Sequence, residues 1–150
     1  MIHVFENHDL LTEHPSQLID VTDDVRDVVR RAAVTNGMAL VYSPHTTCAV
    51  VINERESGFI EDFAELLNEL APTEGRYYRH DDMTRRTEGL DDEDLHPNGW
   101  SHLRAGLLSS SSQTVPIVEG ELMLGRWQRI FFCELDRSRS RKIFIQVVGE

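Results

Sequence analysis

Apolar residues follow two different spacings along the chain, and these spacings predict the order of its helices and strands. Runs of β-branched and aromatic residues, alternating or continuous, predict strands. Such runs cover residues 2–5, 38–42, 48–52, 114–118, 121–124, 127–135 and 142–148. Apolar positions three and four residues apart predict helices that begin near residues 22, 57 and 98.

The ends of the predicted helices carry residues typical of helix caps. Thr22 or Asp23 is the expected N-cap of the first helix, which Asn36-Gly37 should end in a left-handed turn. Ser57 is the expected N-cap of the second helix, and Pro72 closes it. The first helix should bury one stripe, made of Val25, Val28, Val29, Ala32 and Ala33. The third should turn inward Trp100, Leu103, Leu107 and Leu108.

The order of elements predicts an α+β fold with a largely antiparallel sheet and one domain over residues 1–150. The last two strands should form a hairpin. Residues 73–96 have little periodicity and form a long loop, which in a compact domain is usually functional or mobile. No GxGxxG motif or P-loop is present, which argues against a nucleotide-binding fold.

Charge narrows the classes of partner. The chain has 26 acidic against 15 basic residues and a formal net charge of -11. Such a field repels nucleic acid and anionic membranes, so neither is an expected partner. No apolar run is long enough for a membrane span and no signal peptide is evident, so we expect a soluble, cytoplasmic protein. The acidic surface with almost no lysine also suggests adaptation to high salt. Cys48 and Cys133 are expected to be buried thiols and not a disulfide.

The stretch Ser43–Glu54 carries polar groups at both ends of an expected buried strand. His45 lies at one end, and Asn53 and Glu54 lie at the other. Alternation along the strand places Glu54 on the same face as Cys48. For this stretch alone, a turn followed by a helix cap is the preferred explanation, and it involves no chemistry.

Other polar residues lie where elements begin or end. Asn98 and His102 are four residues apart and share one face of a helix. His80 lies in a polar loop. Imidazole and carboxylate groups are the usual ligands of divalent metals, but the spacings between the histidines match no specific zinc motif. Glu134 shares an apolar strand face, so it is paired, metal-bound, protonated or at the sheet edge. Surface hydrogen bonding remains the simpler interpretation for each histidine.

Several motifs together resemble the YjbQ-like family. They are His45-Thr-Thr47, Ile52-Asn-Glu54, Tyr78-Arg-His-Asp81, Asn98 with His102-Leu-Arg-Ala105, Leu124-Gly-Arg-Trp-Gln128, Glu134 and Gly149-Glu150. They occur in the right order over nearly the whole chain. The resemblance implies an antiparallel β-sandwich flanked by helices, assembled as a homotrimer. It also implies a secondary thiamine-phosphate synthase activity, which joins an aminopyrimidine methyl diphosphate to a thiazole phosphate and releases pyrophosphate.

The resemblance also implies roles for individual residues. His45, His80 and His102 would hold a divalent metal, zinc or magnesium, or a phosphate. Glu54 and Glu134 would join His45 as catalytic residues. Phosphate or substrate would be bound by Thr46, Thr47, Asn98 and Gln128. The chain departs from the family pattern at Arg126, Asp136–Arg139, Ser109-Ser110 and Trp100, of which Ser109-Ser110 bears most on phosphate binding.

Three functions remain open from these residues. The first is a metal-assisted transferase acting on a phosphorylated small molecule. The second is a non-enzymatic binding or structural trimer, in which the same side chains bond between subunits. The third is a metal-dependent hydrolase. Convergence of many His, Glu and Asn side chains on one pocket would favour the enzyme.

Overall fold

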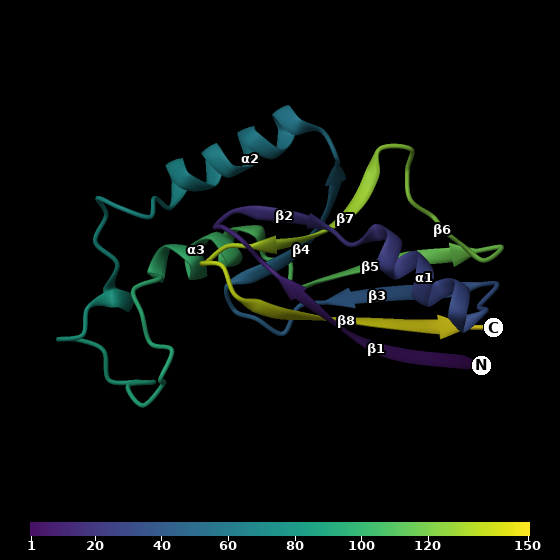
Figure 1. The fold of residues 1–150 in the computed structure, drawn as a ribbon, viewed down its shortest axis with the longest axis horizontal. Helices are drawn as coiled ribbons and strands as arrows, with labels where there is room; N and C mark the ends of the chain where they lie inside the picture. Colours follow the sequence, from purple (N-terminus) through teal and green to yellow (C-terminus); the bar gives the residue numbers. More distant parts are fainter.

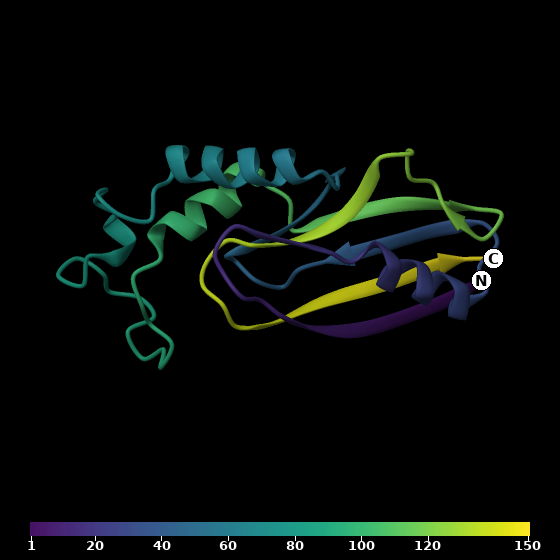
Figure 2. The same ribbon diagram turned by 45° about the horizontal axis from the view of Figure 1, so that its top comes forward.

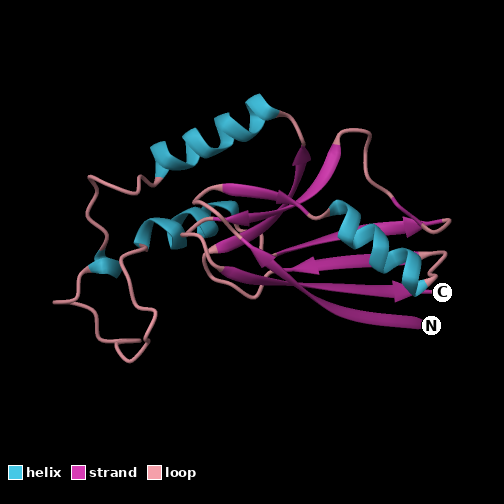
Figure 3. Ribbon diagram, in the orientation of Figure 1, coloured by secondary structure: helices cyan, strands magenta, loops and turns pink.

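Eight strands form two antiparallel sheets in the computed structural model, which describes all residues 1–150 (Figures 1 and 3). One sheet has the order β1-β8-β3-β5-β6, made of Ile2–Leu11, Ser140–Gly149, Gly37–Tyr42, Ser112–Val118 and Glu121–Leu122. The other has the order β2-β7-β4, made of Gln17–Asp20, Gln128–Glu134 and Cys48–Glu54. The predicted α+β fold with an antiparallel sandwich is confirmed.

The main core lies between the two sheets and helix α1 (Thr22–Ala32). Both sheets contribute to it, for example Val50 and Phe132 from one and Ile145 from the other. Helix α1 buries its valine stripe as the spacing predicts. The N-cap of α1 is Val21, so the prediction of Thr22 or Asp23 is wrong. The Thr22 hydroxyl instead accepts a hydrogen bond from the Ile130 N–H at 2.8 Å.

The end of α1 also differs from the prediction. The helix stops at Ala32, and Ala33 takes the left-handed conformation with φ of 52°. Gly37 instead begins β3, where an added Cβ would lie 2.1 Å from the Val148 carbonyl oxygen. This glycine is therefore explained by the close approach of β3 to β8, and not by a helix stop.

The predicted hairpin of the last two strands is wrong. Strand β7 pairs with β2 and β4, whereas β8 lies between β1 and β3 in the other sheet. The chain crosses from one sheet to the other at residues 135–139. Strand pairing depends on partners far away in the sequence, so the short spacing between two strands did not reveal their separation. Cys48 and Cys133 are buried free thiols, as expected.

The remaining helices gather at the end of the molecule away from the chain termini (Figures 1 and 2). They are α2 (Ser57–Leu70), the 3-10 helix η1 (Arg79–Asp81) and α3 (Gly99–Leu108). Helix α2 is capped by Glu56 and not by Ser57, since the Glu56 carboxylate accepts from the N–H groups of Gly58 and Phe59. None of the helices is both long and apolar enough to cross a membrane.

The inward face of α3 is only partly as predicted. Trp100 is buried, but Leu103 and Leu107 are exposed. Arg104 takes an inward position, where its guanidinium donates to the Ala71 carbonyl at 2.9 Å and lies over the Trp100 ring. A buried arginine that satisfies backbone carbonyl groups leaves no apolar periodicity, so the pattern missed it.

Candidate functional site

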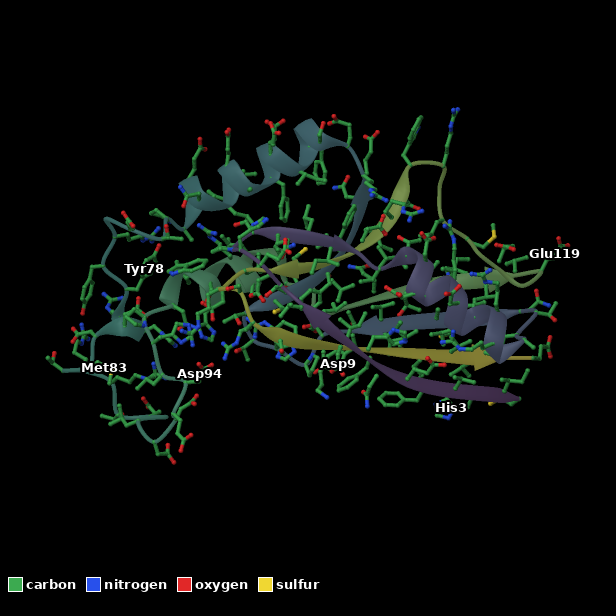
Figure 4. The ribbon with its side chains drawn as sticks, in the orientation of Figure 1. His3, Asp9, Tyr78, Met83, Asp94 and Glu119 are labelled. Carbon is green, nitrogen blue, oxygen red and sulfur yellow. The ribbon has the colours of Figure 1, made fainter.

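A cavity of about 330 Å³ opens next to the start of β4, the end of β7 and the start of β8, where four parts of the chain meet. The segment between β3 and β4, the loop before α3, the start of α3 and the β7–β8 connection all contribute. Asp94, labelled in Figure 4, belongs to this lining. We call this cavity the histidine pocket, because its lining includes His45, His80, His96 and His102.

Six of the nominated site residues line the histidine pocket together, namely His45, Thr46, Thr47, His80, Asn98 and His102. They come from three segments spread between positions 45 and 102 of the chain, so these sequence motifs meet in space. Their chemical roles stay predictions, since proximity alone assigns none.

Glu54 and Gln128 lie outside the pocket within this chain. They face each other across β4 and β7 at one end of the ladder, whereas Cys48 and Glu134 pair at the other end. Six residues of extended strand separate the two ends by about 20 Å. The expected cluster of Glu54 with His45 is therefore not formed within one chain, because opposite ends of a strand cannot share one site.

His80 and His102 face each other in the pocket, with ring centroids 4.5 Å apart. Asp81 organises this contact: its Oδ1 accepts from His80 Nδ1 at 3.1 Å and from the Gly99 N–H at 2.8 Å. The same carboxylate thus caps α3 and fixes the His80 ring, leaving Nε2 without a protein partner. Gly99 permits the approach, because a Cβ there would lie 2.7 Å from Tyr78.

His45 uses one ring nitrogen for the fold. Its Nε2 accepts a hydrogen bond from the Lys142 backbone N–H at 3.0 Å. The neutral ring therefore carries its proton on Nδ1 and can offer the pocket a donor. Burial, followed by the charge of Arg141, lowers the pKa of His45. Burial and the neighbouring charge of His80 likewise lower the pKa of His102, so both rings favour the neutral form.

Glu134 lies beneath the pocket and is fully buried. Its two oxygens accept from Arg141 Nε and Nη2, each at 2.7 Å, and also from the Thr12 hydroxyl at 2.9 Å. Arg141 Nη2 donates to Thr47 Oγ1 at 3.0 Å, and Arg141 lines the pocket. Glu134 therefore acts by positioning Arg141 and cannot touch a ligand directly, which changes the catalytic role expected for it.

Asp136 orients a second group of pocket side chains. Its buried carboxylate accepts from His96 Nε2 at 3.1 Å and from Asn98 Nδ2 at 3.2 Å. His96 Nδ1 donates to the Asp94 carbonyl at 2.6 Å. Both nitrogens of His96 are used within the protein, so this ring stabilises the pocket wall and has no nitrogen left for a ligand.

The donor set does not form a metal site in this arrangement. No group of three or more His, Cys, Asp or Glu side chains is placed to hold a metal ion. His45 in particular has Nε2 committed to Lys142, so it cannot join His80 and His102 through that atom. The predicted trio is thus brought into one pocket without being arranged as metal ligands.

Comparison with known proteins agrees with the motifs. Residues 6–150 match the family described as UPF0047 protein YjbQ-like. The chain belongs to this family. A UPF0047 protein of Archaeoglobus fulgidus is 40% identical over 139 residues, covering 93% of this chain and 97% of the relative. The UPF0047 protein YugU of Bacillus subtilis is 31% identical, covering 92% and 94%.

Solved structures of YjbQ-like proteins share the fold. A YbjQ-like protein of unknown function from Sulfolobus solfataricus aligns with a TM-score of 0.84 at 31% identity, covering 99% of this chain and 98% of that one. An uncharacterized YjbQ/UPF0047 protein from Clostridium acetobutylicum aligns with a TM-score of 0.79 at 34% identity, covering 95% and 99%. These comparisons establish the family, and the names of these relatives state no activity.

Several lining residues of this YjbQ-like pocket were not nominated from the sequence. They are Pro44, Arg86, Asp92, Asp94, Leu95, His96, Asp136, Arg139 and Arg141. Two basic clusters, at residues 85–86 and 137–142, stand out in so acidic a chain and contain all three arginines. That signal could have nominated them. The aspartates carry no such signal among 26 acidic residues.

Proposed function

We propose that this YjbQ-like protein is an acid–base transferase that acts on a phosphorylated small molecule in the histidine pocket. The observation that supports it most is the contact of His80 with His102, beside Arg86, Arg139 and Arg141 in one cavity. Imidazole exchanges protons near neutral pH, and guanidinium groups pair with phosphate oxygens. Together they supply the two functions that a phosphate-ester substitution requires.

The reaction we propose is the one the family resemblance implies. The ring nitrogen of a thiazole phosphate attacks the methylene carbon of an aminopyrimidine methyl diphosphate. The new C–N bond forms as the C–O bond to the diphosphate breaks, and pyrophosphate leaves with the electron pair. The protein must hold the two rings in line and stabilise the charge that develops on the leaving group.

Three pocket side chains, those of His80, Arg141 and His45, have roles in this proposal that follow from their contacts. His80 presents Nε2, and its Nδ1 is held by Asp81, so the ring can give a proton to the departing diphosphate once protonated. Arg141 can pair with a substrate phosphate in the histidine pocket from a fixed position, because Glu134 and Thr47 hold its guanidinium. His45 contributes an Nδ1 proton as a hydrogen-bond donor.

A divalent metal was expected from the resemblance, but the residues do not fit a three-ligand site. The steps proposed here therefore use only the side chains of the chain. Assays with and without added Mg²⁺ or Zn²⁺ test the metal expectation separately. Turnover that requires either ion would restore it.

The proposal is tested by incubating the purified protein with the two precursors and measuring thiamine phosphate by chromatography. His80→Gln should lower turnover by about 10² to 10⁴, the range for loss of a general acid or base. His102→Gln removes the ring that contacts His80 and should lower turnover as well. His45→Ala should also lower turnover, through loss of a donor. The matched control is His14→Gln, because His14 is exposed and lies outside the pocket.

Two results would count against this function. Wild-type protein that forms no thiamine phosphate would remove the proposed reaction, and unchanged turnover in folded His80→Gln and His102→Gln would remove the pocket from it. Phosphate or pyrophosphate released from the diphosphate precursor alone would favour the hydrolase instead. Circular dichroism of each variant establishes that the fold is retained.

We also propose the homotrimer that the resemblance implies. An aromatic cluster on the outer face of the larger sheet supports an assembly: Phe5 is 54% exposed, and its ring and that of Tyr42 lie 5.4 and 6.1 Å from the ring of Phe144. Such exposed apolar patches commonly mark protein interfaces. Light scattering should give the mass of three chains, and Phe5→Arg should reduce it. A monomeric wild-type protein would exclude the trimer.

A further inference from the structure

A second cavity, of about 460 Å³, opens beside the histidine pocket. We call it the arginine pocket; its lining is Arg79, His80, Arg85, Arg86, Glu88 and Gly89. His80 and Arg86 line both cavities. It lies in the loop that carries Met83 and Asp94 at the end of the molecule opposite Glu119 (Figure 4). The two cavities are therefore neighbours that share the side chains of His80 and Arg86.

The charge of the arginine pocket differs from that of the histidine pocket. In the histidine pocket two of the three lining arginines are paired with carboxylates: Arg141 pairs with Glu134, and Arg139 pairs with Asp94 and Asp136. In the arginine pocket three guanidinium groups are opposed only by the carboxylate of Glu88. The first lining is balanced in charge and the second is basic.

The arginines of this second lining form no ion pairs. No carboxylate lies within 4.0 Å of the guanidinium nitrogens of Arg79, Arg85 or Arg86, although the chain has 26 acidic residues against 15 basic ones. Asp82 is near Arg85 in sequence, but its carboxylate accepts from Tyr77 and Thr84 instead. Three unpaired arginines around one cavity are unexpected in so acidic a protein.

Arg86 is held in place by the backbone of its own loop. Its Nε donates to the Glu88 carbonyl at 2.9 Å, and its Nη1 approaches the His80 carbonyl at 3.4 Å. These contacts orient the guanidinium between the two cavities before any ligand arrives. A preorganised arginine loses less conformational entropy on binding than a free one.

We propose that the arginine pocket binds the diphosphate group of a substrate whose reacting carbon lies in the histidine pocket. This inference rests on the proposed function, which already has an organic diphosphate as substrate, and adds the residues that would hold its diphosphate group. Guanidinium groups bind phosphate oxygens in bidentate pairs, and three of them suit more negative charge than a single phosphate carries. His80 stands between the two cavities, where it meets the oxygen that joins the diphosphate to the reacting carbon.

Inorganic pyrophosphate is the probe, and isothermal titration calorimetry measures its binding without any turnover. The double variant Arg79→Gln/Arg85→Gln should bind pyrophosphate at least tenfold more weakly than the wild type, because it loses two charge-assisted partners. The control, Arg55→Gln/Arg126→Gln, removes the same charge from residues that line neither cavity and should stay within twofold. His102→Gln should also keep its affinity, since His102 lines only the histidine pocket.

Three results would overturn the inference: no pyrophosphate binding to the wild type at millimolar concentration, equal weakening in both double variants, or unchanged binding in Arg79→Gln/Arg85→Gln. The binding and turnover assays fail independently. If the wild type binds pyrophosphate as expected but shows no turnover, the proposed reaction is excluded and the anion site still stands. Normal turnover by the wild type, with pyrophosphate binding unchanged in Arg79→Gln/Arg85→Gln, would exclude the anion site and leave the proposed reaction standing.

Discussion

The buried pair of Glu134 and Arg141 supports a quantitative prediction about stability. Glu134 is fully buried and Arg141 is 5% exposed, and two hydrogen bonds of 2.7 Å join them. In Glu134→Gln one oxygen becomes an NH₂ group. Each oxygen position already faces a donor of Arg141, so either orientation of the amide sets donor against donor. The substitution also leaves the Arg141 charge without its partner.

Removing one partner of a buried pair costs about 3 to 5 kcal/mol. That is a large part of the roughly 5 to 15 kcal/mol by which a domain is stable. At about 2 to 4 °C per kcal/mol for a chain of this size, the melting temperature should fall by roughly 6 to 20 °C. Thermal unfolding followed by circular dichroism and calorimetry measures the change.

The control is Glu65→Gln, which removes the same charge from an exposed position on α2. It should change stability by less than about 0.5 kcal/mol. The double variant Glu134→Gln/Arg141→Met should lose less than the sum of the two single variants, because it leaves no buried charge unpaired. A Glu134→Gln protein as stable as the control, or strictly additive losses, would refute the reasoning.

Further predictions follow from other buried groups and from the charge of the chain. Burial lowers the pKa of His45 and His102, so the unfolded chain takes up protons near pH 6.5 before the folded chain does. The free energy of unfolding should therefore fall as pH drops below about 6.5. Replacing both histidines with Gln should make the free energy of unfolding depend less on pH, and an unchanged dependence would contradict this reasoning. Burial raises the pKa of Cys48 to about 12 and that of Cys133 still further. Iodoacetamide at pH 8 should therefore modify both thiols only after denaturation. Rapid modification of the native protein would contradict the burial of these thiols. Arg104→Leu leaves the Ala71 carbonyl without its donor and should cost about 1 to 3 kcal/mol in denaturant unfolding, whereas a loss below about 0.5 kcal/mol would show that the contact contributes little. The net charge of -11 predicts a higher melting temperature in molar salt than in dilute buffer, and a curve unaffected by salt would remove the hypothesis of salt adaptation.

Local patterns along the chain were sufficient for most of the secondary structure. The valine stripe of α1, the two apolar faces of β4 and the turn at Glu119-Gly120 each depend on neighbours within a few positions. Such features follow from side-chain spacing and backbone preference, which are already present in the unfolded chain. The motifs at His45, His80 and His102 could be nominated for the same reason.

Pairing, burial of charge and the use of individual ring nitrogens required the folded chain. The sequence cannot separate β7 from β8, because the strands that β7 pairs with lie far away along the chain. Nor can it tell that Glu134 is enclosed by Arg141 while Glu54 lies at the opposite end of the same ladder. Residue types and their order predict which groups can do chemistry. Only long-range packing decides which of them meet, which nitrogen or oxygen each has left, and which charges stay unpaired.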